Sequence, residues 1–180
     1  MGTRKEDDII EPKAVFVGDP AAPVTLTEFA DYESPNAVSA HEVVKEILQQ
    51  YQGKVRFNFR HFPLRAKHQK AQKAAEAVVA AAQEGKFWEM HEILLANRRN
   101  LGTISLKSYA KAIGVTNKSF LDQLINGRYA WSVQDDLDEG LRLGVREIPT
   151  FFINGQKLEG PATVENIREK IEIELKKLST

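Results

Sequence analysis

Residues 24–61 read VTLTEFADYESPNAVSAHEVVKEILQQYQGKVRFNFRH, and this stretch decides the fold of the chain. Val24–Phe29 and Val55–His61 alternate apolar and polar residues, a pattern typical of strands. Between them, Ala37–Tyr51 carries apolar residues at intervals of three and four, the spacing of an amphipathic helix. Because two strands joined through a helix pair most economically in parallel, we predict a βαβ unit.

The segments next to this unit carry further local signals. Ser34 and Pro35 suit the N-cap and the first position of the helix, and Gln52-Gly53 suits its end. Upstream, Ala14–Val17 is predicted as a short strand, separated from the next one by the turn-forming residues GDPAAP.

The second half of the chain changes to helices, a hairpin and a last helix. Helices are predicted at Gln69–Glu84, Lys86–Asn97, Ser105–Ile113, Asn117–Ile125 and Arg128–Leu143. Asn154-Gly155 is the strongest short hairpin signal, and it joins predicted strands at Thr150–Ile153 and Gln156–Leu158. Thr163–Leu178 is predicted as a final amphipathic helix. The expected order is therefore β-α-β, a block of helices, then β-β-α.

Length and charge limit the organisation and the partners. The chain has 180 residues, enough for one full core, with 25 Lys plus Arg against 25 Asp plus Glu. Since no net field attracts nucleic acid or an anionic membrane, neither is an expected partner. The longest apolar run, Ala77–Ala82, is too short to insert into a bilayer. We expect a flexible arm over residues 1–13 and a single domain over 14–180, with a helical insertion at about 65–143.

Cysteine is absent from the whole sequence. Structural disulfides, thiolate metal sites and cysteine nucleophiles are therefore excluded. The start, MGTRKEDDII, lacks the apolar stretch of a secretory signal. We expect a cytoplasmic location for the chain as given, and a periplasmic or membrane-anchored one if a signal or anchor was removed.

Several segments resemble the DsbA-like thiol-disulfide oxidoreductases of the thioredoxin superfamily. These segments are Gly18–Ala37, Val55–Leu64, Ala71–Ala77, Gly85–Leu95 and Gly144–Gly155. They lie at the expected intervals and cover essentially everything after the arm. The resemblance implies an α/β, thioredoxin-like fold with an inserted helical subdomain.

The chain departs from that family where the family does its chemistry. Residues 34–37 would be Cys-Pro-x-Cys there, and they are SPNA here. Disulfide exchange needs a thiolate that attacks a sulfur. The hydroxyl of Ser34 stays protonated near neutral pH, and Ala37 offers no resolving group. We expect no thiol redox activity and no catalytic residue, although the family consists of enzymes.

The resemblance also implies a surrounding site. Glu28 matches a buried acid that the family uses in proton transfer, and Pro149 matches the family's cis-proline. The backbone of Ile148, just before that proline, would accept an extended peptide by strand addition. The implied ligand- or peptide-binding residues are Tyr32, Ser34, Pro35, Asn36, Ile148 and Pro149.

Three functional interpretations stay open. The first is a non-redox module that uses no cofactor and binds an extended peptide or protein client, or serves in a larger assembly; such domains also occur attached to membrane transporters. The second is a kappa-class-like glutathione transferase or isomerase, in which Ser34-Pro35 would replace the cysteine motif and hold the glutathione thiolate. The third is an active disulfide oxidoreductase whose cysteines were replaced by engineering.

Other chemistry-bearing residues favour structural roles. The four histidines are His41, His61, His68 and His91, and their spacing matches no metal signature. Solvent or packing roles are therefore predicted for them, and no metal is expected. The sequence contains no G-x-S-x-G elbow of a hydrolase. Tyr129 and Trp131 near the start of a predicted helix are expected to be buried; the alternative is an exposed pair that helps to line a groove.

Overall fold

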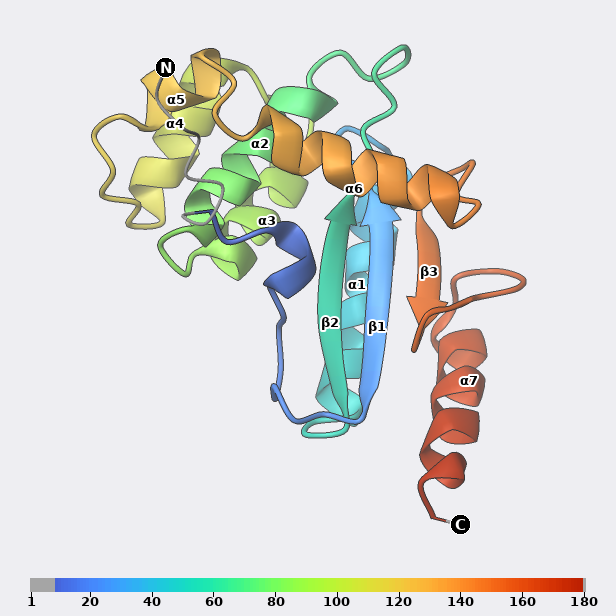
Figure 1. Ribbon diagram of the computed structural model, residues 1–180. Helices are drawn as coiled ribbons and strands as arrows, with labels where there is room; N and C mark the ends of the chain where they lie inside the picture. The colour runs from blue at the N-terminus through green and yellow to red at the C-terminus, as the bar shows by residue number, and fades with distance from the viewer. Residues whose placement is uncertain (1–8, 180) are drawn as a thin grey trace, which may run out of the picture.

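The computed structural model describes residues 9–179, which form a four-stranded sheet with helices on both faces (Figure 1). The strands are β1 (Val24–Ala30), β2 (Val55–His61), β3 (Thr150–Ile153) and β4 (Gln156–Lys157), in the order β2-β1-β3-β4. β1 and β2 pair in parallel, with Val24 opposite Val55, and β3 runs antiparallel to β1. The predicted βαβ unit is confirmed.

Seven α-helices complete the described part of the chain. They are α1 (Asn36–Gln50), α2 (Ala71–Ala82), α3 (Phe87–Ala96), α4 (Thr103–Ala112), α5 (Phe120–Ile125), α6 (Ala130–Arg142) and α7 (Val164–Lys177). Figure 1 shows α1 behind the sheet and α6 across its front, with α2–α5 gathered beside the sheet. α7 packs against α1. None of the helices within residues 9–179 combines the length and apolar character that a bilayer span requires.

The front of the sheet packs closely against α6. Phe29, Phe62, Val145 and Phe152 form a small buried apolar cluster there. Gly140 of α6 makes the close approach feasible, because a Cβ atom at this position would lie 2.7 Å from Cδ2 of Phe62. Any larger residue would therefore push α6 away from the sheet.

A buried ion pair joins α6 to β2. Nε of Arg60 lies 2.7 Å from Oδ1 of Asp136, and both side chains are almost fully buried. The other carboxylate oxygen of Asp136 accepts a hydrogen bond from the backbone N–H of His61, at 2.9 Å. Glu139 lies 3.4 Å from the Arg60 guanidinium and adds a second, partly exposed carboxylate. These contacts fix the insertion on the sheet.

Most predicted elements form within one or two residues of their expected bounds. The helix expected from Asn117 begins only at Phe120, and the helix expected to start at Ser105 begins at Thr103. In the hairpin, Asn154 and Gly155 have positive φ angles of 49° and 81°, as a type I′ turn requires.

Two predictions are wrong. Ala14–Val17 does not form a strand: Pro12–Ala14 is the short 3₁₀ helix η2, and only Val17 pairs with Phe57. The Asn58 amide donates hydrogen bonds to the carbonyls of both Pro12 and Val15, which turns this segment away from an extended path. Trp131 is 58% exposed, whereas Tyr129 is buried, because residues two apart at a helix start point in different directions.

The predicted arm covers residues 1–13, of which residues 1–8 lie outside the described part of the chain. The Gln83 side chain exchanges hydrogen bonds with the backbone N–H and C=O of Ile10, at 2.8 and 2.9 Å. Pro12 is buried. Residues 10–12 thus lie against the end of α2.

We predict that Asp136→Asn lowers the free energy of unfolding by about 3 kcal/mol, because it leaves the buried Arg60 guanidinium without its main counter-charge. Urea denaturation followed by circular dichroism measures this loss. Asp135→Asn, at an exposed position on the same helix, is the matched control and should change stability very little. Equal losses for the two variants would contradict the role assigned to the ion pair.

Candidate functional site

The loop between β1 and α1 is organised by the buried carboxylate of Asp31. Its Oδ1 accepts hydrogen bonds from the backbone N–H groups of Glu33 and Ser34, at 3.1 and 2.9 Å. Its Oδ2 accepts one from the backbone N–H of Leu64, at 3.0 Å, and lies 2.8 Å from Nδ1 of His68. One side chain therefore ties the loop after β1 to the loop after β2.

Asp31 and His68 were not among the predicted site residues. A local signal for Asp31 exists in the sequence, since an aspartate often accepts hydrogen bonds from backbone N–H groups two or three residues later. No comparable signal points to His68, because its partner lies 37 residues away in the chain. The structure brings the two together because β1 and β2 are parallel neighbours.

Ser34 and Ala37, which the resemblance matches to two redox cysteines, are both 4% exposed. α1 begins at Asn36, one residue later than Pro35, and the Ser34 carbonyl accepts a hydrogen bond from the backbone N–H of Ala37. Within residues 9–179 the Ser34 hydroxyl makes no hydrogen bond to the helix. Pro35 already has helical angles and directly follows Ser34, as predicted, but the Ser34 side chain does not supply the expected capping hydrogen bond.

Ile148 and Pro149 lie at the same end of the sheet as the start of α1. Thr150, the first residue of β3, is opposite Phe29 near the end of β1, so the residues just before β3 come close to those just after β1. The Ile148–Pro149 peptide bond is cis. In the described part of the chain, the backbone N–H and C=O of Ile148 make no hydrogen bond.

Glu28 is buried in the middle of β1. Its carboxyl is 2% exposed, and burial raises its pKa from the ordinary 4.5 to about 8. Phe59 and Phe151 lie opposite it on the two neighbouring strands. No hydrogen-bond donor within residues 9–179 contacts this carboxyl, so it is protonated in the folded chain near neutral pH.

Tyr32 links the site to the helical insertion. It is fully buried, and its hydroxyl lies 2.7 Å from Nδ1 of His91 on α3. Burial raises the pKa of Tyr32 well above its usual range, and the nearby Glu28 carboxyl adds to the effect. Tyr32 is therefore a neutral core residue, with no surface open to a ligand.

Three of the four histidines pack into one buried aromatic cluster. The rings of His41 and His91 are 5.0 Å apart, and His61 lies against Tyr32 and Phe59. Burial lowers the pKa of His61 to about 3 and the pKa of His91 well below its usual range, so both rings are neutral. No group of His, Cys, Asp and Glu in the described residues has the geometry of a metal site.

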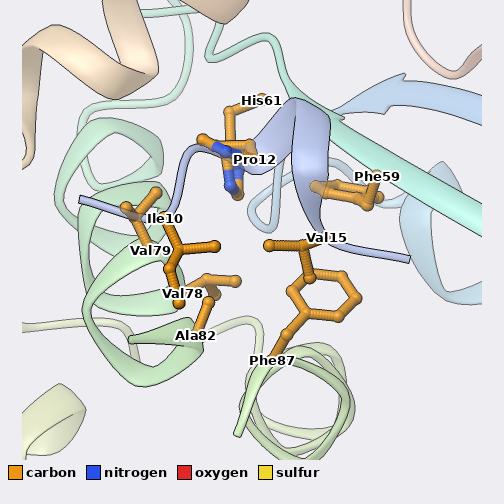
Figure 2. Close-up of a pocket in the computed structure, with 9 residues that line it drawn as sticks. All are labelled: Ile10, Pro12, Val15, Phe59, His61, Val78, Val79, Ala82 and Phe87. Atoms are coloured by element: carbon orange, nitrogen blue, oxygen red, sulfur yellow. The ribbon is translucent and has the colours of Figure 1, made fainter. Parts of the chain in front are cut away.

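The structure contains one small cavity beside this cluster (Figure 2). Its volume is about 10 Å³, close to the minimum for a single water molecule. It is lined by Ile10, Pro12, Val15, Phe59, His61, Val78, Val79, Ala82 and Phe87. Residues 10–15 cover it from outside, so this cavity is a packing defect of the core and no ligand site.

A much larger groove of about 740 Å³ lies between the segment after β2 and the C-terminal end of α6. Its lining residues are Phe62, Pro63, Leu64, Arg65, Ala66, Lys67, Leu137, Leu141, Gly144, Val145 and Arg146. Ile148 packs against the apolar cluster that forms part of its floor. The groove therefore continues from the predicted peptide-binding backbone.

The fold and the residues at the start of α1 define a DsbA-like, thioredoxin-fold protein that lacks the redox cysteines. The thioredoxin family model matches residues 11–173, and the chain belongs to this family. The oxidised crystal structure of BdbD from Bacillus subtilis is 26% identical, with a TM-score of 0.83 over 92% of this chain and 93% of BdbD. A thioredoxin-like oxidoreductase from Silicibacter pomeroyi, 21% identical, shares the fold with a TM-score of 0.76 over 96% and 98% of the two chains.

Curated relatives with higher sequence identity are much longer proteins. The Na(+)/H(+) antiporter NhaA 3 of Salinispora tropica is 40% identical over 157 residues, which is 87% of this chain and 24% of the antiporter. NhaA 1 of Salinispora arenicola is 37% identical over the same shares of the two chains. The chain thus spans about a quarter of the length of these relatives.

We predict that Asp31→Ala lowers the free energy of unfolding by about 2–4 kcal/mol, because it leaves three backbone N–H groups in a buried loop without their acceptor. Urea denaturation measures the loss, and faster hydrogen exchange at the amides of Ser34 and Leu64 localises it. Asp19→Ala is the matched control, because the exposed Asp19 carboxylate also accepts a backbone hydrogen bond. Unchanged exchange at both amides would contradict the role of Asp31.

A second prediction concerns pH. Between about pH 4.5 and 8 the folded chain keeps a proton on Glu28 that the unfolded chain has lost, so this residue lowers stability as pH rises through that window. Glu28→Gln should match the wild type at about pH 4 and gain up to about 1.4 kcal/mol per pH unit toward pH 8.

Urea denaturation at a series of pH values tests this expectation. The buried histidines have the opposite effect, because they lower the stability of the folded chain on acidification. Both proteins contain these histidines, so their contribution cancels in the difference. Glu169→Gln, at an exposed position on α7, is the control and should show no pH-dependent difference. A difference between the Glu28 variant and the wild type that does not change with pH would show that burial does not raise the pKa of this carboxyl.

Proposed function

We propose that this chain is a non-redox domain that binds an extended polypeptide segment by strand addition beside Pro149. The observation that carries the proposal is the open backbone of Ile148, whose N–H and C=O make no hydrogen bond within residues 9–179. Unpaired backbone groups next to a sheet are the usual acceptors of an added strand.

The chemistry around the site supports binding over catalysis. A chain without cysteine cannot exchange disulfides. The Asp31 carboxylate beside Ser34 is occupied by four donors, one of them the Ser34 backbone N–H. Ser34 itself is buried, so its hydroxyl is poorly placed to attack a substrate. What remains accessible is backbone and apolar surface.

The antiporter relatives support a setting for this domain. They are Na(+)/H(+) antiporters, and the part of each antiporter that matches this chain is about a quarter of its length. We propose that the chain acts as an attached or partnered binding domain of a membrane transporter, and that its ligand is a polypeptide segment of that assembly or of a client.

Titration of the ¹⁵N-labelled chain with a blocked extended peptide tests the proposal by NMR. We expect shifts at the Ile148 and Ser34 amides and none on α4, which lies in the distant insertion. The same peptide with N-methylated backbone nitrogens is the matched control, because it keeps its side chains and loses its donors. Equal shifts with both peptides, or none with either, would refute strand addition.

Glutathione is the comparison ligand in the same experiment. Its short backbone could also reach the proline loop, and its thiolate would need a hydrogen bond from the Ser34 hydroxyl. Shifts at Ser34 with millimolar glutathione that disappear in Ser34→Ala would favour the transferase-like interpretation over the peptide-binding one.

A further inference from the structure

The groove between the segment after β2 and the end of α6 has an apolar floor and a basic rim. Leu64, Leu137 and Leu141 supply the accessible apolar surface, and the buried Phe62 and Val145 lie beneath it. Leu141 is 59% exposed, which is unusual for a leucine on a helix that otherwise packs on a sheet. An apolar surface left open in this way is typical of a site that receives another molecule.

The charged residues along the groove all have the same sign. Arg65, Lys67 and Arg146 line it and are exposed, and no acidic residue is part of the lining. Within the described part of the chain, no carboxylate lies within ion-pair distance of these three cations; the Arg65 Nε donates only to the neutral Gln72 side chain.

This one-sided charge differs from the rest of the chain. The sequence as a whole is neutral, with 25 basic and 25 acidic side chains. Three exposed cations without counter-charges around one apolar groove favour a ligand that brings negative charge.

We propose that the groove binds an acidic polypeptide segment, with its apolar side chains on the floor and its carboxylates on the rim cations Lys67, Arg65 and Arg146. This inference rests on the proposed strand addition, since the groove continues from Ile148 through the cluster of Phe62 and Val145. A strand paired with Ile148 places alternate side chains on one face, so apolar and acidic residues in alternation fit this surface.

Fluorescence anisotropy with three labelled, blocked peptides tests the proposal. In the first peptide Leu alternates with Glu, in the second with Gln, and in the third with Lys. The acidic peptide should bind about tenfold more tightly than the Gln peptide, because three exposed ion pairs together supply about that factor. The preference should shrink as the salt concentration rises from about 0.1 to about 1 M, where screening shortens to a few ångströms.

Charge reversal assigns the effect to the groove. Lys67→Glu/Arg146→Glu should abolish the preference for the acidic peptide, while Lys107→Glu/Lys111→Glu, which makes the same change of net charge on exposed positions of α4, should keep it. All four positions are exposed, and thermal unfolding verifies that both variants fold.

The outcomes separate the two proposals. Equal binding of the acidic and Gln peptides, or tighter binding of the Lys peptide, overturns the acidic ligand and leaves strand addition in place. An equal loss of preference in both double variants also overturns it, since the effect would then come from net charge. Failure of all three peptides to bind overturns both proposals.

Discussion

The candidate site depends on the buried Asp31 carboxylate, which accepts four hydrogen bonds from two loops that are far apart in the chain. Two of them shape the turn before α1, and the other two hold the segment after β2. Since buried N–H groups without acceptors are costly, the carboxylate determines where Ser34 and Leu64 lie. It thereby positions both the start of α1 and one wall of the apolar groove.

A second constraint comes from the sheet. Because β1 and β2 are parallel and β3 is antiparallel to β1, the C-terminal ends of β1 and β2 and the start of β3 meet at one end of the sheet. The cis Ile148–Pro149 bond, the Asp31 loop and the groove all lie there. α6 covers one face of the sheet at this end and is held there by the Arg60–Asp136 ion pair and the close contact at Gly140. The scaffold of a thiol oxidoreductase is thus retained without its sulfur chemistry.

Local signals predicted most of the elements, and the errors have a common cause. The alternation of Val55–His61 and the Asn154-Gly155 turn gave correct strands because neighbouring residues determine these structures. Ala14–Val17 alternates in the same way, yet the Asn58 amide, more than 40 residues away, holds it in another conformation. The expected burial of Trp131 failed for a similar reason, since it depended on which neighbours the fold places against that face of α6.

The sequence by itself determined that the chain has a βαβ core and that it cannot exchange disulfides, because the first follows from periodicity and the second from the absence of cysteine. It also pointed to the proline loop through its resemblance to DsbA-like proteins. Only the tertiary structure decided that Asp31 meets His68, that three histidines are buried in one aromatic cluster, and that Lys67 and Arg146 flank one groove. These residues are brought together by strand pairing and helix packing, whose long-range contacts leave no periodic trace along the chain.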